Sequence, residues 1–284
     1  MPATASVIVS FSSNERIFLD ALLSEAVKFA QQVVVTYGTC FYDGTPEDIE
    51  WIEGKAREWA RRAESGGGGR VKFVSYDVTR EVANNPLKTR PHAYWHNISR
   101  IRGVAELGEL GAVTDLAELD EQKAKPDFVF FVDGDEIAEG DLVREWLAKV
   151  DIPRERAYML ANYWYFRNPR YQAMSLESSI LMVPYAWVDS DAKAHAVLMK
   201  DWERHGVENV VSGVLAAPNR PMFHHFSWVR SKADLLRKVA TWGHKDDKDW
   251  AGLIEHEFAG EFEGRDFVHG YEFKIVPNRW AILV

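Results

Sequence analysis

Residues 128–135 have the sequence FVFFVDGD, an apolar run that ends directly in two aspartates. Consecutive aromatic and β-branched residues predict a strand that is buried on both faces, as in the middle of a parallel sheet. Asp133 and Asp135 lie two positions apart, so an extended backbone would point both carboxylates to the same side. Ligands of open α/β sheets bind beyond the carboxyl ends of the strands. The stretch therefore predicts a central strand with a binding site at its end.

The segments on either side of this strand alternate between short apolar runs and stretches with helical periodicity. The apolar runs predict strands at 7–11, 33–37, 71–76, 158–166, 179–183 and 222–228. The helical periodicity predicts helices at 15–31, 46–63, 94–107 and 140–150, and the glycines at 66–69 predict a flexible turn. Strands that alternate with helices predict an α/β fold with a mostly parallel central sheet and flanking helices.

The chain is expected to have two parts. Residues 1–215 contain the alternating strands and helices and would form the catalytic domain. Residues 216–284 mix short apolar runs with histidine and tryptophan, and we expect them to form a C-terminal extension that caps the sheet and completes the site.

Composition restricts the class of protein. The chain has 284 residues, of which 46% are hydrophobic and 27% charged, the balance of an ordinary globular protein. Cys40 is the only cysteine, so an intramolecular disulfide is excluded and we expect a reducing, cytoplasmic location, or the host cytoplasm for a phage protein. No run of apolar residues is long enough to span a membrane, and we expect no secretory leader.

The net charge of −9 argues against a nucleic-acid partner, but it is unevenly distributed. Residues 70–102 contain seven Lys and Arg against two acids, and residues 220–248 contain seven against three. Either basic segment could serve a diphosphate or a polyanionic acceptor.

The aspartate pair suits a divalent cation. Mg²⁺ and Mn²⁺ take hard oxygen ligands and complete their shells with water and substrate phosphates. Gly134, between the two aspartates, lets another part of the backbone approach closely. A cation that bridges a diphosphate stabilises the charge that builds on a leaving nucleoside diphosphate.

The order of these features resembles that of the GT-A glycosyltransferases, in particular of family-2-like members. The first strand with Asn14-Glu15 and the D-x-D after a buried strand near mid-chain carry the resemblance, which covers residues 6–185. Residues 92–100 also lie where such enzymes have a helix that lines the donor site. Strand 33–37 departs from the pattern, because Thr36-Tyr37-Gly38 replaces an Asp pair that binds the nucleobase in many relatives. The nucleotide therefore stays open.

This resemblance implies a GT-A (Rossmann-like) fold and a metal-dependent, Leloir-type glycosyltransferase, either a hexosyl- or a pentosyltransferase. It would use Mn²⁺ or Mg²⁺ and a UDP-sugar, or a GDP- or dTDP-sugar, as the donor. The implied nucleotide contacts are Ser10, Phe11, Asn14 and Glu15 in the first loop, Asp77 on the base edge, Arg100 on ribose or phosphate, and Gly134 beside the metal. GT-A enzymes often take a third metal ligand from a C-terminal histidine, and His225 would join Asp133 and Asp135 in that role.

Basic residues follow the predicted strand 222–228. Arg230 and Lys232, with Arg237, Lys238 and His244 beyond them, could neutralise the diphosphate as a segment closes. A catalytic base is expected only in an inverting enzyme. Glu177, in a polar stretch between two apolar runs, and Asp246 are the candidates, and the stereochemical outcome is left open.

The acceptor and the class of protein have alternatives. The rings of Tyr158, residues 163–166 and Tyr171 could stack on a sugar or on a nucleobase extruded from DNA. We expect a glycan-type acceptor first, and a hydroxymethylated base in phage DNA second. A nucleotidyltransferase is an alternative, but the loop 10–14, SFSSN, contains none of the glycines of a phosphate loop. A non-catalytic carbohydrate-binding module is the third reading, and the oligomeric state is open.

Overall fold

A continuous mixed β-sheet organises the chain. It is seen in a computed structural model that describes residues 2–64, 70–77, 91–109, 125–190, 193, 197–198 and 210–284. The strands follow the order β3-β2-β1-β4-β7-β6-β9-β5, with β8 paired to β6 and β10 paired to β7. The turn predicted at 66–69 lies outside the described residues.

The N-terminal half of the sheet is parallel. Its strands are β1 (Ala5–Phe11), β2 (Gln32–Gly38), β3 (Arg70–Tyr76) and β4 (Phe128–Asp133). Val7 of β1 lies between Val33 of β2 and Phe130 of β4. Because these strands run in one direction, their carboxyl ends lie at one edge of the sheet, where the first loop meets the end of β4.

The second half is largely antiparallel. Its strands are β5 (Glu136–Ala138), β6 (Ala157–Phe166), β7 (Tyr171–Pro184), β8 (Val210–Val214), β9 (Phe223–Trp228) and β10 (Phe273–Ile275). Strand β7 is antiparallel to β4 and β6, and β9 lies between β6 and β5. The predicted α/β class is confirmed, and the strand predicted at 179–183 is the end of the longer β7.

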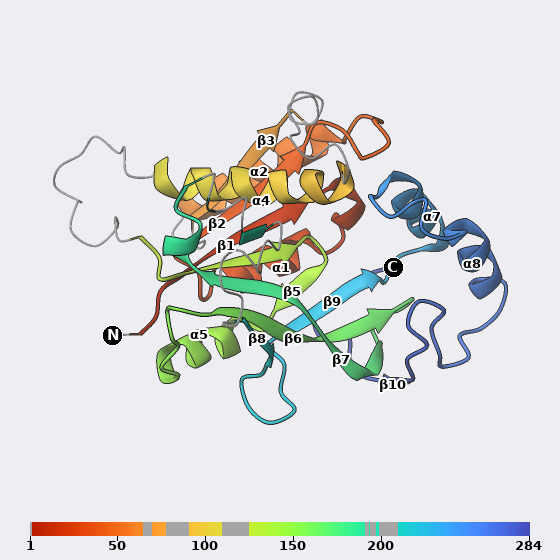
Figure 1. The fold of residues 1–284 in the computed structure, drawn as a ribbon. Coiled ribbons are helices and arrows are strands. Elements are labelled where there is room, and N and C mark those ends of the chain that lie inside the picture. Colours follow the sequence, from red (N-terminus) through yellow and green to blue (C-terminus); the bar gives the residue numbers. More distant parts are fainter. Residues whose placement is uncertain are drawn as a thin grey trace.

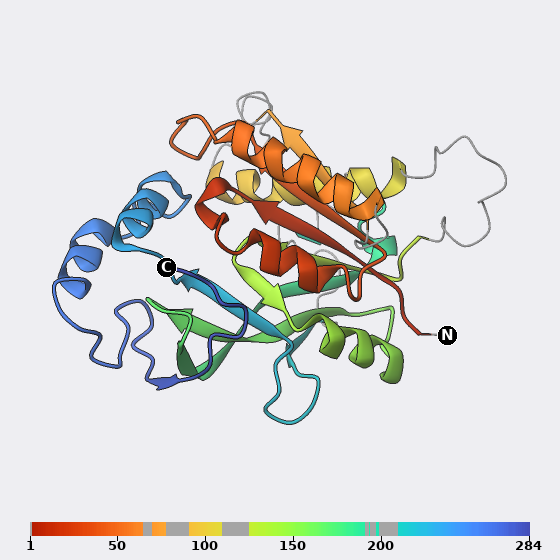
Figure 2. The ribbon, with the colours of Figure 1, turned by 180° about the vertical axis from the view of Figure 1, so that it is seen from behind.

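Helices cover both faces of the sheet (Figures 1 and 2). Helix α4 (Pro91–Glu109) packs Ile101 and Val104 on one face, against Ile8 of β1 and Phe131 of β4. The opposite face carries α1 (Leu19–Ala26), α2 (Ile49–Glu64) and α5 (Gly140–Lys149). Burial of alternate residues of β1 and β4 on opposite faces explains why both strands are apolar throughout.

Two of the predicted helices are shorter than their periodicity suggested. Residues 13–15 form a separate 3-10 turn, η1 (Ser13–Glu15), and α1 begins only at Leu19. Helix α2 begins at Ile49 rather than at 46, because Glu47 is held against the first loop, where its carboxylate accepts from the hydroxyl and the backbone N–H of Ser13.

The C-terminal part contributes β9 to the sheet and then two helices at one end of it (Figure 1), α7 (Lys232–Thr241) and α8 (Trp250–Glu257). The helices pack on an aromatic cluster that includes Trp164, Trp228 and Trp250. In the part of the chain that the structure describes, no helix has the length and apolar character of a membrane span.

Candidate functional site

The two aspartates at the end of β4 contact different residues. The strand ends at Asp133, and residues 134–135 form a turn, so the alternation expected of extended backbone does not apply. Asp133 Oδ1 accepts from Arg100 Nη2 at 3.1 Å, whereas Asp135 is directed elsewhere and is only 4% exposed. The two carboxylates therefore have different partners, and their joint binding of one cation stays a prediction.

Gly134 makes this turn possible by close packing. A Cβ atom at this position would lie 2.9 Å from Cβ of Glu15 and 3.0 Å from the ring of Phe11. The first loop therefore packs directly on the backbone between the aspartates, and any side chain here would push it away.

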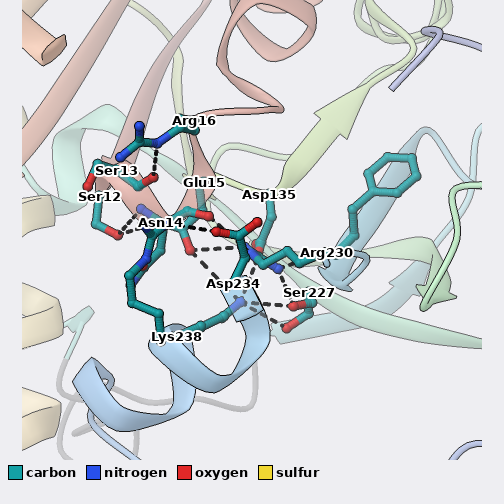
Figure 3. A network of polar contacts seen from close by, with 12 residues as sticks. Ser12, Ser13, Asn14, Glu15, Arg16, Asp135, Ser227, Arg230, Asp234 and Lys238 are labelled. Carbon is teal, nitrogen blue, oxygen red and sulfur yellow. Dashed lines mark hydrogen bonds and ion pairs between the residues drawn. The ribbon is translucent and has the colours of Figure 1, made fainter. Parts of the chain in front are cut away.

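Asp135 is the centre of a buried charged network (Figure 3). Its Oδ2 accepts from Arg230 Nη2 at 2.9 Å and from Lys238 Nζ at 2.8 Å. Burial alone would raise the pKa of this carboxyl, but the neighbouring cations outweigh burial and hold the pKa well below its ordinary value. Asp135 is thus a carboxylate at neutral pH.

Arg230 is 1% exposed, which for an arginine requires that its donors be paired. Its Nε donates to the Asn14 carbonyl at 3.1 Å, and its Nη2 donates to Glu15 Oε1 at 3.0 Å as well as to Asp135. The guanidinium also lies 5.1 Å from the ring centre of Phe18. Arg230 therefore ties the first loop to the end of β4.

His225 approaches Asp135 from β9. The backbone N–H of Phe226 donates to the Asp135 carbonyl at 2.8 Å, and this bond holds β9 next to the turn that carries Asp135. Nε2 of His225 lies 3.6 Å from Asp135 Oδ1, and Nδ1 lies 3.8 Å from Glu177 Oε2. Burial lowers the pKa of His225, but Asp135, Glu177 and Glu136 outweigh it and raise the pKa to about 10.

Glu136 is a further buried acid next to this network. Its Oε2 accepts from the backbone N–H of Asp133 at 2.9 Å, and its Oε1 accepts from the Ser179 hydroxyl. Burial, together with the negative charge of Asp133, raises the pKa of Glu136 to about 7. The carboxyl therefore braces the turn after β4 from within the sheet.

Glu177 lies on the other side of His225 from Asp135. It is on β7, opposite Asn162 of β6, and its Oε1 is 3.2 Å from Nε2 of His269. The candidate base predicted at Glu177 is therefore brought to the same site as Asp135 and His225. The second candidate, Asp246, is not, because its side chain is 87% exposed next to Lys245.

The predicted nucleotide contacts have varied positions. Ser10 accepts from the Ser99 hydroxyl at 2.9 Å, and Asp77 is exposed at the end of β3. Phe11 is a core residue that stacks on Trp51 with ring centres 6.2 Å apart. These contacts with the nucleoside stay predictions.

Asn14 and Glu15 contact other residues of the protein. The amide of Asn14 donates to Thr241 Oγ1 at 3.0 Å and accepts from Arg237 Nε at 3.0 Å. Glu15 is partly buried against Arg230, and burial raises its pKa although Arg230 and Lys238 oppose the shift. Both residues connect the first loop to the segment that begins at Arg230.

Two predicted residues lie farther along the C-terminal part. Lys232 pairs with Glu255 of α8, and His244 Nδ1 lies 2.8 Å from Asp247 Oδ2 on an exposed turn. Lys238, and not Lys232, contacts Asp135. Lys238 and Val239 follow Leu235 by three and four residues, so all three lie on the buried side of α7. That spacing was visible in the sequence and would have selected Lys238.

The aromatic run after the aspartates is largely core. Trp164, Tyr165 and Phe166 are buried, as is Tyr158, so these rings do not offer a stacking surface as predicted. Tyr163 and Tyr171 are only partly buried. Tyr42 was not predicted at all, yet it is partly buried near Asp133 and Arg100, and this burial raises its pKa well above the ordinary value.

The residues present can be tested against the predicted cation. No group of three potential metal ligands occurs among the residues that the structure describes. The pair Asp135 Oδ1 and His225 Nε2, 3.6 Å apart, nevertheless offers one oxygen and one imidazole, and buried Nδ1 of His225 has no hydrogen-bond partner in the described structure. Because an imidazole must be neutral to bind a metal, a cation would displace the proton that His225 carries in its absence; the pair then fits a cation that takes its other ligands from phosphates and water.

Comparison with known proteins finds only remote similarity to solved structures. No family model and no curated protein matches the sequence. Among solved structures, the glycosyltransferase GlyE of Streptococcus pneumoniae is 9% identical with a TM-score of 0.37, and 91% of this chain aligns with 64% of that one. An active-site mutant of LgtC is 11% identical over 98% of this chain and 99% of that one, with a TM-score of 0.39. The inositol-1-phosphate CTP transferase from T. maritima is 9% identical over 82% of this chain and 94% of that one, with a TM-score of 0.36.

Proposed function

We propose that this chain is a metal-dependent glycosyltransferase that moves a sugar from a nucleotide-sugar donor to a hydroxyl of a glycan-type acceptor. The observation that supports it most is the convergence of Asp135, His225, Arg230 and Lys238 beyond the end of β4. Buried charges of both signs are costly and are concentrated at functional sites. They suit a ligand that itself combines an anion with a cation, as a metal-bound diphosphate does.

The roles follow from the contacts. Asp135 and His225 would hold Mn²⁺ or Mg²⁺, with Asp133 near the same turn. The bound cation would stabilise the negative charge that develops on the leaving nucleoside diphosphate. Lys238 places a point charge beside Asp135, where its Nζ also donates to the Ser227 carbonyl at 3.0 Å, and it would bind a phosphate oxygen of the diphosphate. Arg230 is committed to Glu15 and to the Asn14 carbonyl.

Glu177 is the proposed base. It would accept the proton of the acceptor hydroxyl while that oxygen bonds to the sugar C1, and the C1–O bond to the diphosphate breaks with its electron pair on the diphosphate. Attack opposite to the leaving group would invert the configuration at C1. A product with retained configuration would remove Glu177 from this role.

The charge near Glu177 favours a neutral glycan over DNA as the acceptor. Residues 261–272, which include the contact His269, contain four acids and one arginine. This segment would repel a phosphodiester backbone. The second choice, a hydroxymethylated base in phage DNA, is tested by offering modified DNA and glycans to the same enzyme preparation.

A thermal-shift screen with UDP-, GDP- and dTDP-sugars, each with and without Mn²⁺, tests the donor class. A ligand present at about 100 times its Kd stabilises the folded state by about 2.7 kcal/mol, and we expect a metal-dependent shift for at least one nucleotide. Asp135→Asn, which preserves shape, should remove the shift, whereas Asp151→Asn on the exposed surface should retain it.

Release of nucleoside diphosphate from the selected donor then tests the chemistry. A carbohydrate-binding module would release none, and a nucleotidyltransferase would release pyrophosphate from a nucleoside triphosphate. Equal shifts with and without metal, or an unaffected Asp135→Asn variant, would contradict metal dependence.

A further inference from the structure

A loop at residues 266–271 is clasped by one buried carboxylate. Asp266 is 4% exposed, and its Oδ1 accepts from the backbone N–H groups of Val268 at 2.7 Å, His269 at 2.6 Å and Gly270 at 3.3 Å. Its Oδ2 accepts from the N–H of Tyr271 at 2.8 Å. Gly270 has φ of 74°, a conformation that favours glycine. The backbone of this loop is therefore fixed from within.

The fixed loop presents the ring of His269 to the candidate site. The imidazole is stacked on Tyr271, with ring centres 4.9 Å apart and an interplanar angle of 22°, and it meets the edge of Trp164 at 4.9 Å. Its Nε2 lies 3.2 Å from Glu177 Oε1. Two aromatic contacts and the loop backbone thus determine where the imidazole nitrogen lies.

The carboxylate of Glu177 consequently lies between two imidazoles. Oε1 faces His269 on the side of the C-terminal loop, and Oε2 faces His225, which is in turn beside Asp135. A flexible glutamate side chain has several rotamers, and contacts on both oxygens favour one of them. A base must lie within hydrogen-bond reach of the proton that it accepts, so its orientation affects the rate.

We infer that His269 is a positioning residue, held by the loop that Asp266 clasps, which fixes Glu177 in the orientation needed to accept the proton of the acceptor hydroxyl. The inference rests on the proposed function, because it assigns a task to the contact around the proposed base. It gives the loop 266–271 a role on the acceptor side of the site, whereas Asp135, Arg230 and Lys238 act on the donor side.

The test is steady-state kinetics of His269→Phe with the donor and acceptor selected above. Phenylalanine keeps an aromatic ring against Tyr271 and Trp164 but removes the nitrogen that faces Glu177. We expect kcat for transfer to fall by about 10²-fold, the cost of a misplaced reacting group, with the donor KM and the donor-induced thermal shift unchanged. His269→Gln, which restores an N–H at a similar reach, should recover part of kcat.

Controls separate the possible failures. Asp266→Ala, which frees the loop backbone, should also lower kcat, and His256→Phe on an exposed face of α8 should behave as the unmodified protein. If His269→Phe transfers sugar at the unmodified rate, the inference is wrong while the proposed function stands. A fall in kcat that His269→Gln does not relieve at all would also overturn it. If the unmodified protein neither binds a nucleotide sugar nor transfers sugar, the proposed function itself fails.

Discussion

His224 and His225 are neighbours on β9, yet they lie on opposite faces of the strand in opposite environments. His224 faces the core, where its Nδ1 is 2.7 Å from the Tyr165 hydroxyl and its Nε2 is 3.0 Å from Glu139 Oε1. Burial lowers the pKa of His224, whereas surrounding carboxylates raise the pKa of His225 to about 10. Neighbouring residues of a strand point to opposite faces, so one of these histidines packs in the core and the other lies in the candidate site.

The largest effect on activity is expected from a change of Glu177, which lies next to His225. Glu177→Gln removes the proposed base while preserving shape, and transfer should slow by about 10²–10⁴-fold, the usual contribution of a general base. Sugar-transfer assays with the selected donor and acceptor measure this loss. Asp246→Asn, at the exposed alternative, should transfer sugar at the unmodified rate, and the reverse result would exchange the two assignments.

The largest effect on stability is expected on the His224 face. His224→Ala leaves Glu139 and the Tyr165 hydroxyl without this partner and opens a cavity, so the free energy of unfolding should fall by about 3 kcal/mol. Urea denaturation measures it, with His256→Ala as the exposed control, expected to change by less than about 0.5 kcal/mol. The folded fraction of His224→Ala should still respond to nucleotide sugar and Mn²⁺. Loss of that response would mean that the two faces are not independent.

A smaller effect is expected from His225→Gln. This change removes one proposed metal ligand but leaves Asp135, so apparent Mn²⁺ affinity in the nucleotide-dependent thermal shift should weaken by at least roughly 10–100-fold, the usual loss when only an outer partner of a metal ligand is removed. The variant His224→Gln is the matched control on the same strand. Equal Mn²⁺ affinity in both variants would exclude His225 as a ligand.

The smallest effect concerns pH. The folded protein keeps His224 neutral at pH values where the unfolded chain binds a proton, because its folded pKa is below the ordinary 6.5. This contribution is complete above pH 6.5 and is lost as the pH falls below it, at less than about 1.4 kcal/mol per pH unit. Unfolding measured between about pH 7 and pH 5 should therefore show a shallower decline in His224→Gln. An unchanged slope would mean that His224 is not the responsible group.

The sequence predicted those features that depend on local pattern. The apolar run of β4 and its aspartates were located correctly, and His225, the histidine selected in strand 222–228, lies beside Asp135. The position of Asp135 was not predicted, because a turn after Asp133 ends the alternation. The approach of His269 to Glu177 was also missed, since contacts between residues 92 positions apart leave no periodic pattern in either segment.

The buried pair of Asp135 and Arg230 has a consequence for how the molecule comes together. The two residues are 95 positions apart, so their contact closes a long loop of chain at an entropic cost. The pairing of β1 with β2 and of β2 with β3 closes shorter loops and costs less. Until the segment that contains Arg230 has folded, Asp135 remains hydrated and the end of β4 remains exposed to water. We therefore expect β1, β2 and β3, which pair across shorter loops, to gain protection from hydrogen exchange early in refolding, and the charged tip to gain it last.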